Sequence, residues 1–499
     1  MNANSETAAS AVPAGEAPLG ALACPEPNAR PDLWPTTARR TDSGELEIGG
    51  RPVSAILEQA PAPVYVMDEA DFRGRAATWA ATMAEEFWEG YGLKGGSAFY
   101  AGKAFLTTRV ARIALEEGLG IDTASRGELA VGLAALEEVD GEDATVRAAR
   151  LGLHGNGKTE DEVSTAVYHR LGHLVVDSPE EVGYAVAAVR RWREAGHYGP
   201  QEQAGLMVRL TTGIHAGGHE FISTAHEDQK FGFSILGGQA LMALVRCLQS
   251  PRLELVGIHS HIGSQIFDTS AFEVAARRTM RLMNQFRQAT GTDLPELDLG
   301  GGFGIAYTSG DSPATAERLS RDLREIVDHE RRGYGLAEPR YSIEPGRAIS
   351  GPAAMAIYTV GTVKVVDLEG GAQRVYVSVD GGMSDNIRPA LYAAEYSAVL
   401  AGRASAAAPV LCRVVGKHCE GGDILARDVF LPGDIRPGDL VAIPGCGAYC
   451  RAMASNYNML TRPPVVSVRD GELTTLLRRE TLDDLLALDV GWGASSRDA

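Results

Sequence analysis

The most constraining feature of this chain is a regular alternation of short apolar segments and amphipathic helical segments between residues 97 and 345. We expect strands at 97–101, 121–124, 151–154, 173–177, 206–210, 255–261, 296–299 and 341–344. Helical periodicity falls between them, at 107–117, 128–136, 161–168, 179–195, 271–288 and 315–332. A doubly wound sheet has a similar element order, but eight strand–helix repeats favour a closed α/β fold, the (β/α)8 TIM-like barrel.

After residue 345 the pattern changes to β-like segments separated by Gly, Pro and Asp turns. Strands are expected at 360–366, 374–379, 410–415, 439–443 and 465–469, and helices at 448–457 and 483–488. This predicts a C-terminal antiparallel β domain, Greek-key or β-barrel-like, that also takes in strand-like pieces at 45–66. The expected organisation is a disordered tail (1–35), an N-terminal segment joining the β domain (36–70), the barrel (71–345) and the β domain (346–499).

Charge and cysteine usage limit the partners. The formal net charge is −18, so the surface repels nucleic acid and anionic lipid. The six cysteines form no Cys-x-x-Cys pair, which disfavours a disulfide framework. We find no signal peptide and no run of the ~18 apolar residues that a membrane helix requires. The sequence therefore predicts a cytoplasmic protein with neither a membrane nor a nucleic acid as partner.

Chemistry-bearing residues follow the expected barrel strands. Lys103 follows the first strand, His154 ends the third, and Glu344 ends the eighth. Barrel enzymes keep their active sites at the carboxyl ends of the strands, so these side chains are expected to converge. Desolvation would lower the pKa of Lys103 and free its amine for a Schiff base. A lysine that extends to solvent from the strand end is the structural alternative.

Three other segments leave alternatives open. His259 and His261 lie two apart on the sixth strand and could chelate zinc, or one could stack on a planar ligand while the other is a core histidine. The glycines at 300–302 suit an anion cradle or a simple turn. Glu344 and Arg347 suit a pyridine nitrogen and an anionic group, or an ion pair at a turn.

Several ordered segments together carry a family resemblance. They are Lys103, His-Ser-His-Ile-Gly-Ser-Gln at 259–265, Gly-Gly-Gly at 300–302, Glu-Pro-Gly-Arg at 344–347, and the blocks at 219–232, 380–392 and 416–423. This set resembles the fold-type III pyridoxal-phosphate-dependent decarboxylases and, within them, the diaminopimelate decarboxylase family. The similarity runs from about residue 30 to Leu486.

The resemblance implies a cofactor, pyridoxal 5'-phosphate, and a set of residues that hold it. Lys103 would bind the cofactor covalently, His261 would stack on its ring, and Glu344 would keep the ring nitrogen protonated. The phosphate and its surroundings would be contacted by Ser264, Gly300, Gly301, Gly302, Gly346, Arg347 and Tyr449.

The resemblance also implies a substrate and an assembly. The substrate would be contacted by Arg347, Arg388, Tyr392, Glu420 and Tyr449. Cys419 would donate a proton, and Cys419 and Glu420 would come from the second subunit of a homodimer. Arginines and a carboxylate together suit a substrate end with both a carboxylate and an ammonium. The implied reaction converts meso-2,6-diaminopimelate to L-lysine and CO2.

Three positions depart from the family pattern, namely Gly102, Arg126 and Cys446. They leave room for a related decarboxylase acting on ornithine, lysine, arginine or a secondary-metabolism substrate. Two more alternatives come from other classes. One is a metal-dependent barrel hydrolase that uses His259 and His261, and the other is a cofactor-binding regulatory homologue. Intact Lys103 and Cys419 argue against the regulatory homologue.

Overall fold

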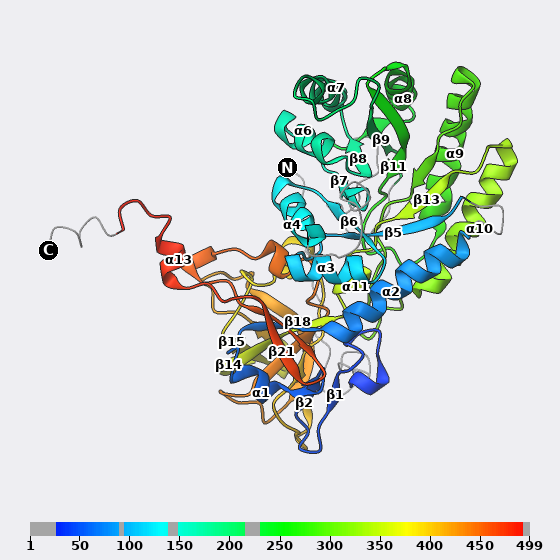
Figure 1. The fold of residues 1–499 in the computed structure, drawn as a ribbon. Coiled ribbons are helices and arrows are strands. Elements are labelled where there is room, and N and C mark those ends of the chain that lie inside the picture. Colours follow the sequence, from blue (N-terminus) through cyan, green and yellow to red (C-terminus); the bar gives the residue numbers. More distant parts are fainter. Residues whose placement is uncertain (1–25, 89–93, 138–147, 215–229, 493–499) are drawn as a thin grey trace, which may run out of the picture.

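A computed structural model describes residues 26–88, 94–137, 148–214 and 230–492. A parallel barrel and a β domain lie side by side (Figure 1). The barrel strands are β5 (Gly96–Ala101), β6 (Gly120–Thr123), β7 (Leu151–Leu153), β8 (His173–Val176), β9 (Ala204–Thr211), β11 (Leu253–Ser260), β12 (Glu296–Asp298) and β13 (Arg340–Ile343). They pair in the order β9-β11-β12-β13-β5-β6-β7-β8, and β8 pairs back to β9, so the sheet is closed. The predicted eight-stranded barrel is confirmed.

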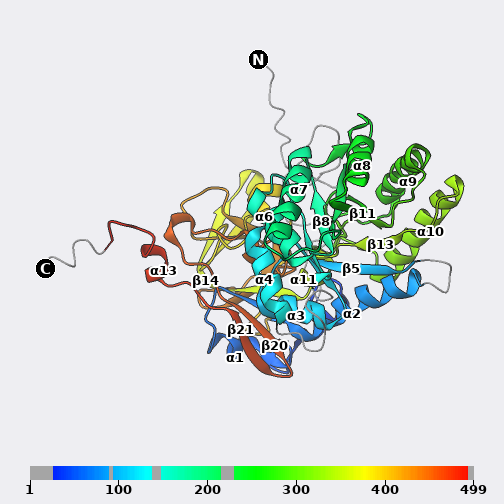
Figure 2. The ribbon, with the colours of Figure 1, turned by 45° about the horizontal axis from the view of Figure 1, so that its top comes forward.

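Helices cover the outside of the barrel (Figure 2). They are α2 (Glu69–Glu86), α3 (Thr108–Glu116), α4 (Arg126–Glu137), α6 (Glu160–His169), α7 (Pro179–Glu194), α8 (Gln239–Gln249), α9 (Ser270–Thr290) and α10 (Ala316–Tyr334). Local sequence sets several of their starts. The side chains of Thr159, Ser178 and Thr315 each accept a hydrogen bond from a backbone N–H in the first turn of the helix that follows. The strands lie beneath these helices in a continuous apolar core.

The β domain is built around the long strand β14 (Ala354–Asp367). This strand pairs with β15 (Gln373–Val379), with β19 (Leu440–Pro444) and with β4 (Val64–Asp68). The remaining strands are β16 (Val399–Leu400), β17 (Pro409–Val415), β18 (Ile424–Pro432), β20 (Val465–Arg469) and β21 (Glu472–Leu477). Most pairs are antiparallel, but β15–β17 and β4–β20 are parallel. Because β4 precedes the barrel in sequence, the chain enters the β domain twice.

Residues on the N-terminal side of β4 also belong to the folded part. Leu33 and Trp34 are fully buried against a second apolar cluster, so the expectation of a tail is wrong for residues 26–35. Residues 1–25 lie outside the described part of the chain. A small sheet of β1 (Arg39–Arg40), β2 (Leu46–Ile48) and β3 (Arg51–Pro52) follows. The boundary predicted between the N-terminal segment and the barrel stays a prediction.

The helix predicted at 448–457 is not formed. The segment contains the 3-10 turn Arg451–Met453 and is followed by another at Tyr457–Met459. Tyr449 has a φ of 58°, which lies in the left-handed region that an α-helix cannot accommodate. The C-terminal helix is present as α13 (Leu482–Leu486). Within the described residues, the helices are too short or too polar to cross a bilayer.

Candidate active site

A cavity of about 270 Å³ opens at the carboxyl ends of the barrel strands, where loops of the β domain reach over it. Its lining residues are Lys103, Ala124, His154, Gly155, Arg209, Phe231, His259, His261, Ser264, Glu344, Arg347, Arg388, Tyr392, Tyr449 and Met453. The structure therefore brings together the predicted site residues of both domains. The sequence places them far apart, and the strand order of the barrel makes them neighbours.

Lys103 lies just beyond β5 and faces a carboxylate from the next strand. Its Nζ is 3.0 Å from Oδ2 of Asp122 and 4.0 Å from Oε2 of Glu344. Desolvation lowers the pKa of Lys103, but the charges of these two carboxylates raise it above its ordinary value. The expectation that burial makes this amine neutral is therefore wrong, because the sequence did not show which anions surround it. Burial also raises the pKa of Asp122 to about 8, against the opposing Lys103 charge.

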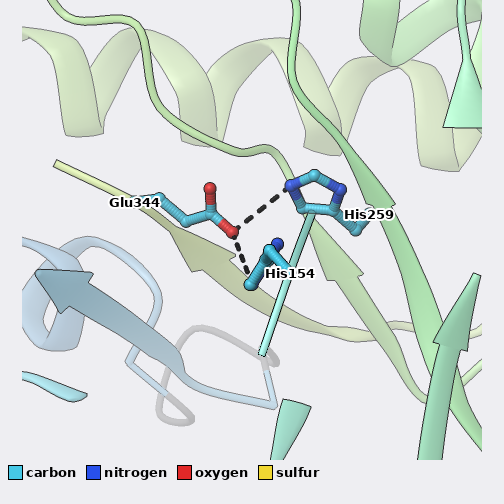
Figure 3. A group of neighbouring side chains, drawn as sticks. All are labelled: His154, His259 and Glu344. Carbon is cyan, nitrogen blue, oxygen red and sulfur yellow. Dashed lines mark ion pairs between the residues drawn. The ribbon is translucent and has the colours of Figure 1, made fainter. Parts of the chain in front are cut away.

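Glu344 directly follows β13 and is flanked by two imidazoles (Figure 3). Its Oε1 lies 3.1 Å from Nε2 of His154 and 3.3 Å from Nε2 of His259. Burial raises the pKa of the carboxyl group, but the two imidazoles hold it well below its ordinary value. All three side chains are buried. The site therefore holds an anionic carboxylate in fixed orientation, with Oε2 on the side of Lys103.

The same three residues are close enough to share a metal ion, since their donor atoms lie within 4.8 Å of one another. This group differs from the predicted zinc pair of His259 and His261, because it contains His154 and not His261. His261 instead accepts a hydrogen bond at Nδ1 from the Gly301 N–H, at 3.2 Å. Burial lowers the pKa of His261 well below its ordinary value, so its ring is neutral.

The glycines after β12 allow a very close approach of three loops. A Cβ at Gly300 would lie 2.3 Å from the Ser260 carbonyl oxygen, and one at Gly301 would lie 2.3 Å from that of Glu344. Gly302 has a φ of 109°, which side chains other than glycine rarely adopt. Neither these glycines nor Gly346 are among the residues that line the cavity. The close approach at the glycines places the backbone so that the His261 and Glu344 side chains line the cavity.

Arg347 is buried in the cavity wall. It donates hydrogen bonds to Oγ of Ser264 at 2.8 Å and to the Tyr307 hydroxyl at 2.5 Å. Its guanidinium also lies 4.6 Å from the centre of the Tyr449 ring. The Nε of Arg347 is buried without a hydrogen-bond partner. This arrangement leaves a fixed cation with an unused donor beside the cavity.

Arg388 begins the short helix α12 (Arg388–Tyr392) and is also buried. It donates a hydrogen bond to the Tyr396 hydroxyl, and its guanidinium lies 4.7 Å from the centre of the Tyr307 ring. Burial lowers the pKa of the Arg388 guanidinium, but Tyr396 and Tyr307 raise it by more. Its pKa therefore lies above the ordinary value, and the group stays charged. Its Nε has no hydrogen-bond partner. Arg388 therefore presents a second fixed cation, with Tyr392 on the same cavity wall.

Besides the glycines, two predicted site residues do not line the cavity. Cys419 and Glu420 lie on an exposed loop between β17 and β18, and neither lines the cavity of its own chain. Both side chains face outwards, so they are accessible to another molecule. The block at 219–232, which carries part of the family resemblance, lies mostly outside the described residues.

The three departures from the family pattern have different structural settings. Gly102 donates its N–H to the Asp122 carbonyl at 2.8 Å, and a Cβ there would lie 3.0 Å from the same oxygen. Arg126 is exposed and pairs with Asp161 at 2.6 Å, outside the cavity. Cys446 is buried, with its Sγ 3.8 Å from the Pro444 carbonyl oxygen. None of the three is among the cavity-lining residues.

Sequence reasoning missed several residues of the site. Asp122 contacts Lys103, and Arg209 and Phe231 line the cavity wall with the Arg209 guanidinium 4.2 Å from the Phe231 ring centre. A signal was present for two of them. Asp122 and Arg209 are both charged residues inside predicted apolar strands. Phe231 lies in a loop, where no periodicity could have identified it.

Comparisons with known proteins agree with this geometry. Residues 79–351 match the family model for the pyridoxal-binding domain of pyridoxal-dependent decarboxylases. The chain therefore belongs to the pyridoxal-dependent decarboxylases.

Relatives define the branch within that class. The chain is 46% identical over 464 residues to diaminopimelate decarboxylase of Mycobacterium tuberculosis, covering 92% of this chain and 98% of the relative. The enzyme of Bacillus subtilis is 39% identical, with 91% and 97% covered. A crystal structure of the M. jannaschii enzyme in complex with L-lysine superposes with a TM-score of 0.78 and 27% identity, covering 91% of this chain and 98% of that one. Within its class, the chain belongs to the diaminopimelate decarboxylases.

The residues at the cavity fit pyridoxal phosphate. A covalent attachment needs a lysine amine, and a ring nitrogen needs an acidic partner; Lys103 and the anionic Glu344 supply these groups. The Oε1 of Glu344 and both ring nitrogens of His259 are buried without a hydrogen bond of good geometry. The Ser264 hydroxyl, which accepts a hydrogen bond from Arg347 at 2.8 Å, can donate its own O–H to a phosphate group. A zinc ion bound by His154, His259 and Glu344 would use the carboxylate that the cofactor's ring nitrogen needs. Because the chain belongs to the pyridoxal-dependent decarboxylases, the cofactor is favoured over zinc.

Proposed function

We propose that this cavity decarboxylates meso-2,6-diaminopimelate to L-lysine and CO2, with Lys103 as the attachment point of pyridoxal phosphate. The observation that carries the proposal is the meeting of Lys103, Glu344 and two buried arginines, Arg347 and Arg388, in one cavity. When bound, the cofactor accepts the electron pair released as the bond between Cα and the carboxylate breaks. The protein residues supply binding, orientation and proton transfer.

Glu344 holds a proton on the ring nitrogen by remaining an anion. Its lowered pKa serves this role, because a nearby negative charge raises the pKa of the ring nitrogen. His154 and His259 keep the carboxylate from rotating away, since each lies against the same oxygen atom. His261 is placed to cover one face of the ring.

Asp122 is placed to exchange a proton with the Lys103 amine. The two groups are in direct contact at 3.0 Å, so Asp122 can take the proton that the amine releases. The amine must lose this proton before it can bond to the cofactor's carbonyl carbon. Asp122 is therefore proposed as the proton acceptor of Lys103.

The two arginines and Glu420 select the substrate. Arg347 and Arg388 both line the cavity, and two guanidinium groups suit the carboxylate at the end of the substrate that does not react. Glu420 would bind the ammonium at the same end. A substrate such as ornithine has no second carboxylate and would leave two buried guanidinium groups without an anion.

We infer that the active enzyme is a homodimer and works in the cytoplasm. Cys419 and Glu420 are exposed and lie outside the cavity of their own chain, so in the proposed function a second subunit would bring them to a cavity. Cys419 would then donate the proton that replaces the lost carboxylate. The five cysteines among the described residues are all free, as is usual in a reducing compartment.

A substrate panel tests the function. Purified holoenzyme is assayed for CO2 release from meso-diaminopimelate, lysine, ornithine and arginine, with Lys103→Ala as the inactive control. We expect release from meso-diaminopimelate alone. Turnover of another amino acid without turnover of meso-diaminopimelate would show that the chain is a specialised relative.

A further inference from the structure

The loop that carries Cys419 and Glu420 is held more tightly than an exposed loop requires. We refer to residues 416–423 as the presenting loop. The Asp423 carboxylate accepts hydrogen bonds from the His418 N–H at 2.8 Å and from the Met383 N–H at 2.6 Å. The Gly416 N–H donates to the Asp423 carbonyl at 3.0 Å, which closes the loop. One buried carboxylate therefore fixes this loop to the neighbouring segment 380–386.

Glycines make room for this carboxylate. A Cβ at Gly416 would lie 2.3 Å from Oδ2 of Asp423, and a Cβ at Gly382 would lie 2.7 Å from its Oδ1. Gly382 also packs against His418, because its Cβ would lie 2.7 Å from the imidazole Cδ2. The backbone is close enough on both sides to exclude any side chain, so the loop has little freedom to shift.

The His418 side chain ties a third segment to the presenting loop. Its Nε2 lies 2.8 Å from Oγ of Ser384, and its Nδ1 lies 2.9 Å from Oδ1 of Asn458. The ring stacks on Tyr457, with centroids 5.2 Å apart and planes 23° apart. The imidazole is nearly buried, at 8% exposed. Three loops, 380–386, 416–423 and 455–459, thus meet at one ring.

The hydrogen bonds define the state of this ring. The backbone N–H of Ser384 can only donate, and it points at Nε2 at 3.4 Å. Nε2 is therefore the acceptor, and Nδ1 carries the proton that is donated to Asn458. Both ring nitrogens have a hydrogen-bond partner, which leaves the ring a single orientation.

The side chain of Cys419, the residue that follows His418, has no such restraint. Cys419 and Glu420 are exposed, as are the neighbouring apolar side chains of Tyr457 and Met459, at 42% and 56%. A rigid backbone that displays a thiol and a carboxylate beside exposed apolar surface suits contact with another molecule. In the proposed function that molecule is a second copy of this chain.

We propose that His418, fixed by Ser384 and Asn458, is a positioning residue that holds Cys419 and Glu420 in the arrangement that completes the cavity of the partner chain. The inference rests on the proposed function, since that function places Cys419 and Glu420 in the partner's site. His418 itself touches neither cofactor nor substrate. Its effect is on the placement of the two residues that follow it.

The test uses His418→Phe, which keeps an aromatic ring against Tyr457 but removes both ring hydrogen bonds. Hydrogen–deuterium exchange is measured in the holoenzyme, together with CO2 release and the cofactor absorption band. We expect exchange of the 416–423 amides to rise several-fold and kcat to fall at least about 10-fold, with the cofactor band unchanged. The control is His329→Phe, the same change at an exposed position on α10, which should alter neither.

A mixed dimer then tests whether the effect crosses between subunits. His418→Phe and Lys103→Ala chains are coexpressed with different affinity tags and purified as mixed dimers. In such a dimer one cavity has an intact Lys103 and receives an intact presenting loop, so about half of the wild-type activity should return. No recovery, or unchanged loop exchange and kcat in His418→Phe, would overturn the proposal.

A second variant and a measurement that needs no substrate keep the proposal for His418 testable. Ser384→Ala removes one ring hydrogen bond with little loss of volume, and it should show the same effects to a smaller degree if His418→Phe does not fold. If the wild-type enzyme releases no CO2 from meso-diaminopimelate, the proposed function fails. The exchange measurement does not depend on substrate, so it still decides whether His418 restrains the loop.

Discussion

Lys103 and Asp122 form a direct ion pair across neighbouring barrel strands, with Nζ and Oδ2 3.0 Å apart. The Lys103 side chain is 35% exposed, whereas the Asp122 side chain is buried at 1%. The other oxygen of Asp122 lies 3.1 Å from Nε2 of His154, and that nitrogen also lies 3.1 Å from Glu344. Lys103 and Glu344 are thus linked through the Asp122 carboxylate and the His154 imidazole.

We predict that Asp122→Asn shifts the pH dependence of cofactor binding. The Asp122 charge raises the pKa of Lys103, so its removal lowers that pKa and makes the neutral amine available at lower pH. Pyridoxal phosphate is added to cofactor-free enzyme, and the rate of band formation is followed against pH. The midpoint should move down by about one unit or more. The surface variant Asp161→Asn should leave the midpoint in place.

We predict that Gly301→Ala weakens cofactor binding. The new Cβ would lie 2.3 Å from the Glu344 carbonyl oxygen, so the loop and Glu344 must move apart. We expect a loss of at least about 10-fold in cofactor affinity, measured by equilibrium dialysis. Gly333→Ala on α10 is the matched control, because a Cβ there meets nothing within 4 Å. Equal affinities for the two variants would contradict the proposed packing.

We predict that Arg388→Lys raises KM for meso-diaminopimelate more than it lowers kcat. A lysine keeps the charge but loses the planar guanidinium that stacks on Tyr307 and binds a carboxylate with two parallel donors. Steady-state CO2 release should show an increase in KM of about 10-fold or more. Arg413→Lys on β17, outside the cavity, serves as control. A change confined to kcat would remove Arg388 from substrate binding.

We predict that Glu296→Gln destabilises the fold at neutral pH and less so in acid. Burial raises the pKa of Glu296, but His173, 2.9 Å away, together with Ser342 lowers it to about 2. A depressed folded-state pKa adds stability above the unfolded value near 4.5, and this stability is lost as the pH falls towards 2. The difference should be at most about 3 kcal/mol at pH 7. Urea unfolding at pH 7 and pH 3 measures it, and a difference that grows in acid would contradict the assignment.

Much of the barrel was predictable because its period is a local property. Each strand is a short apolar run, and each helix has a 3.6-residue pattern, so neither depends on distant parts of the chain. The helix expected at 448–457 is not formed, for a reason that is not local. The left-handed backbone of Tyr449 is imposed by contacts such as the hydrogen bond from its N–H to the Ala104 carbonyl, and no periodicity reports it.

The site was predicted unevenly. Lys103, His261 and Glu344 stand at strand ends or in family motifs, so the sequence identified them. Asp122 and Arg209 became site residues only when the strands closed into a barrel, because their neighbours come from other strands. The charge state of Lys103 was mispredicted for the same reason. Desolvation can be guessed from a sequence, but the positions of opposing charges cannot.

The sequence by itself determined the order of strands and helices, the family and the chemical identities of the groups that family uses. These depend on local periodicity and on residue types at fixed positions. Only the tertiary structure decided that Lys103 faces Asp122, that two imidazoles share one oxygen of Glu344, and that Cys419 lies outside its own cavity. Such contacts join residues distant in sequence, and they exist only after closure of the barrel and packing of the β domain fix the distances between them.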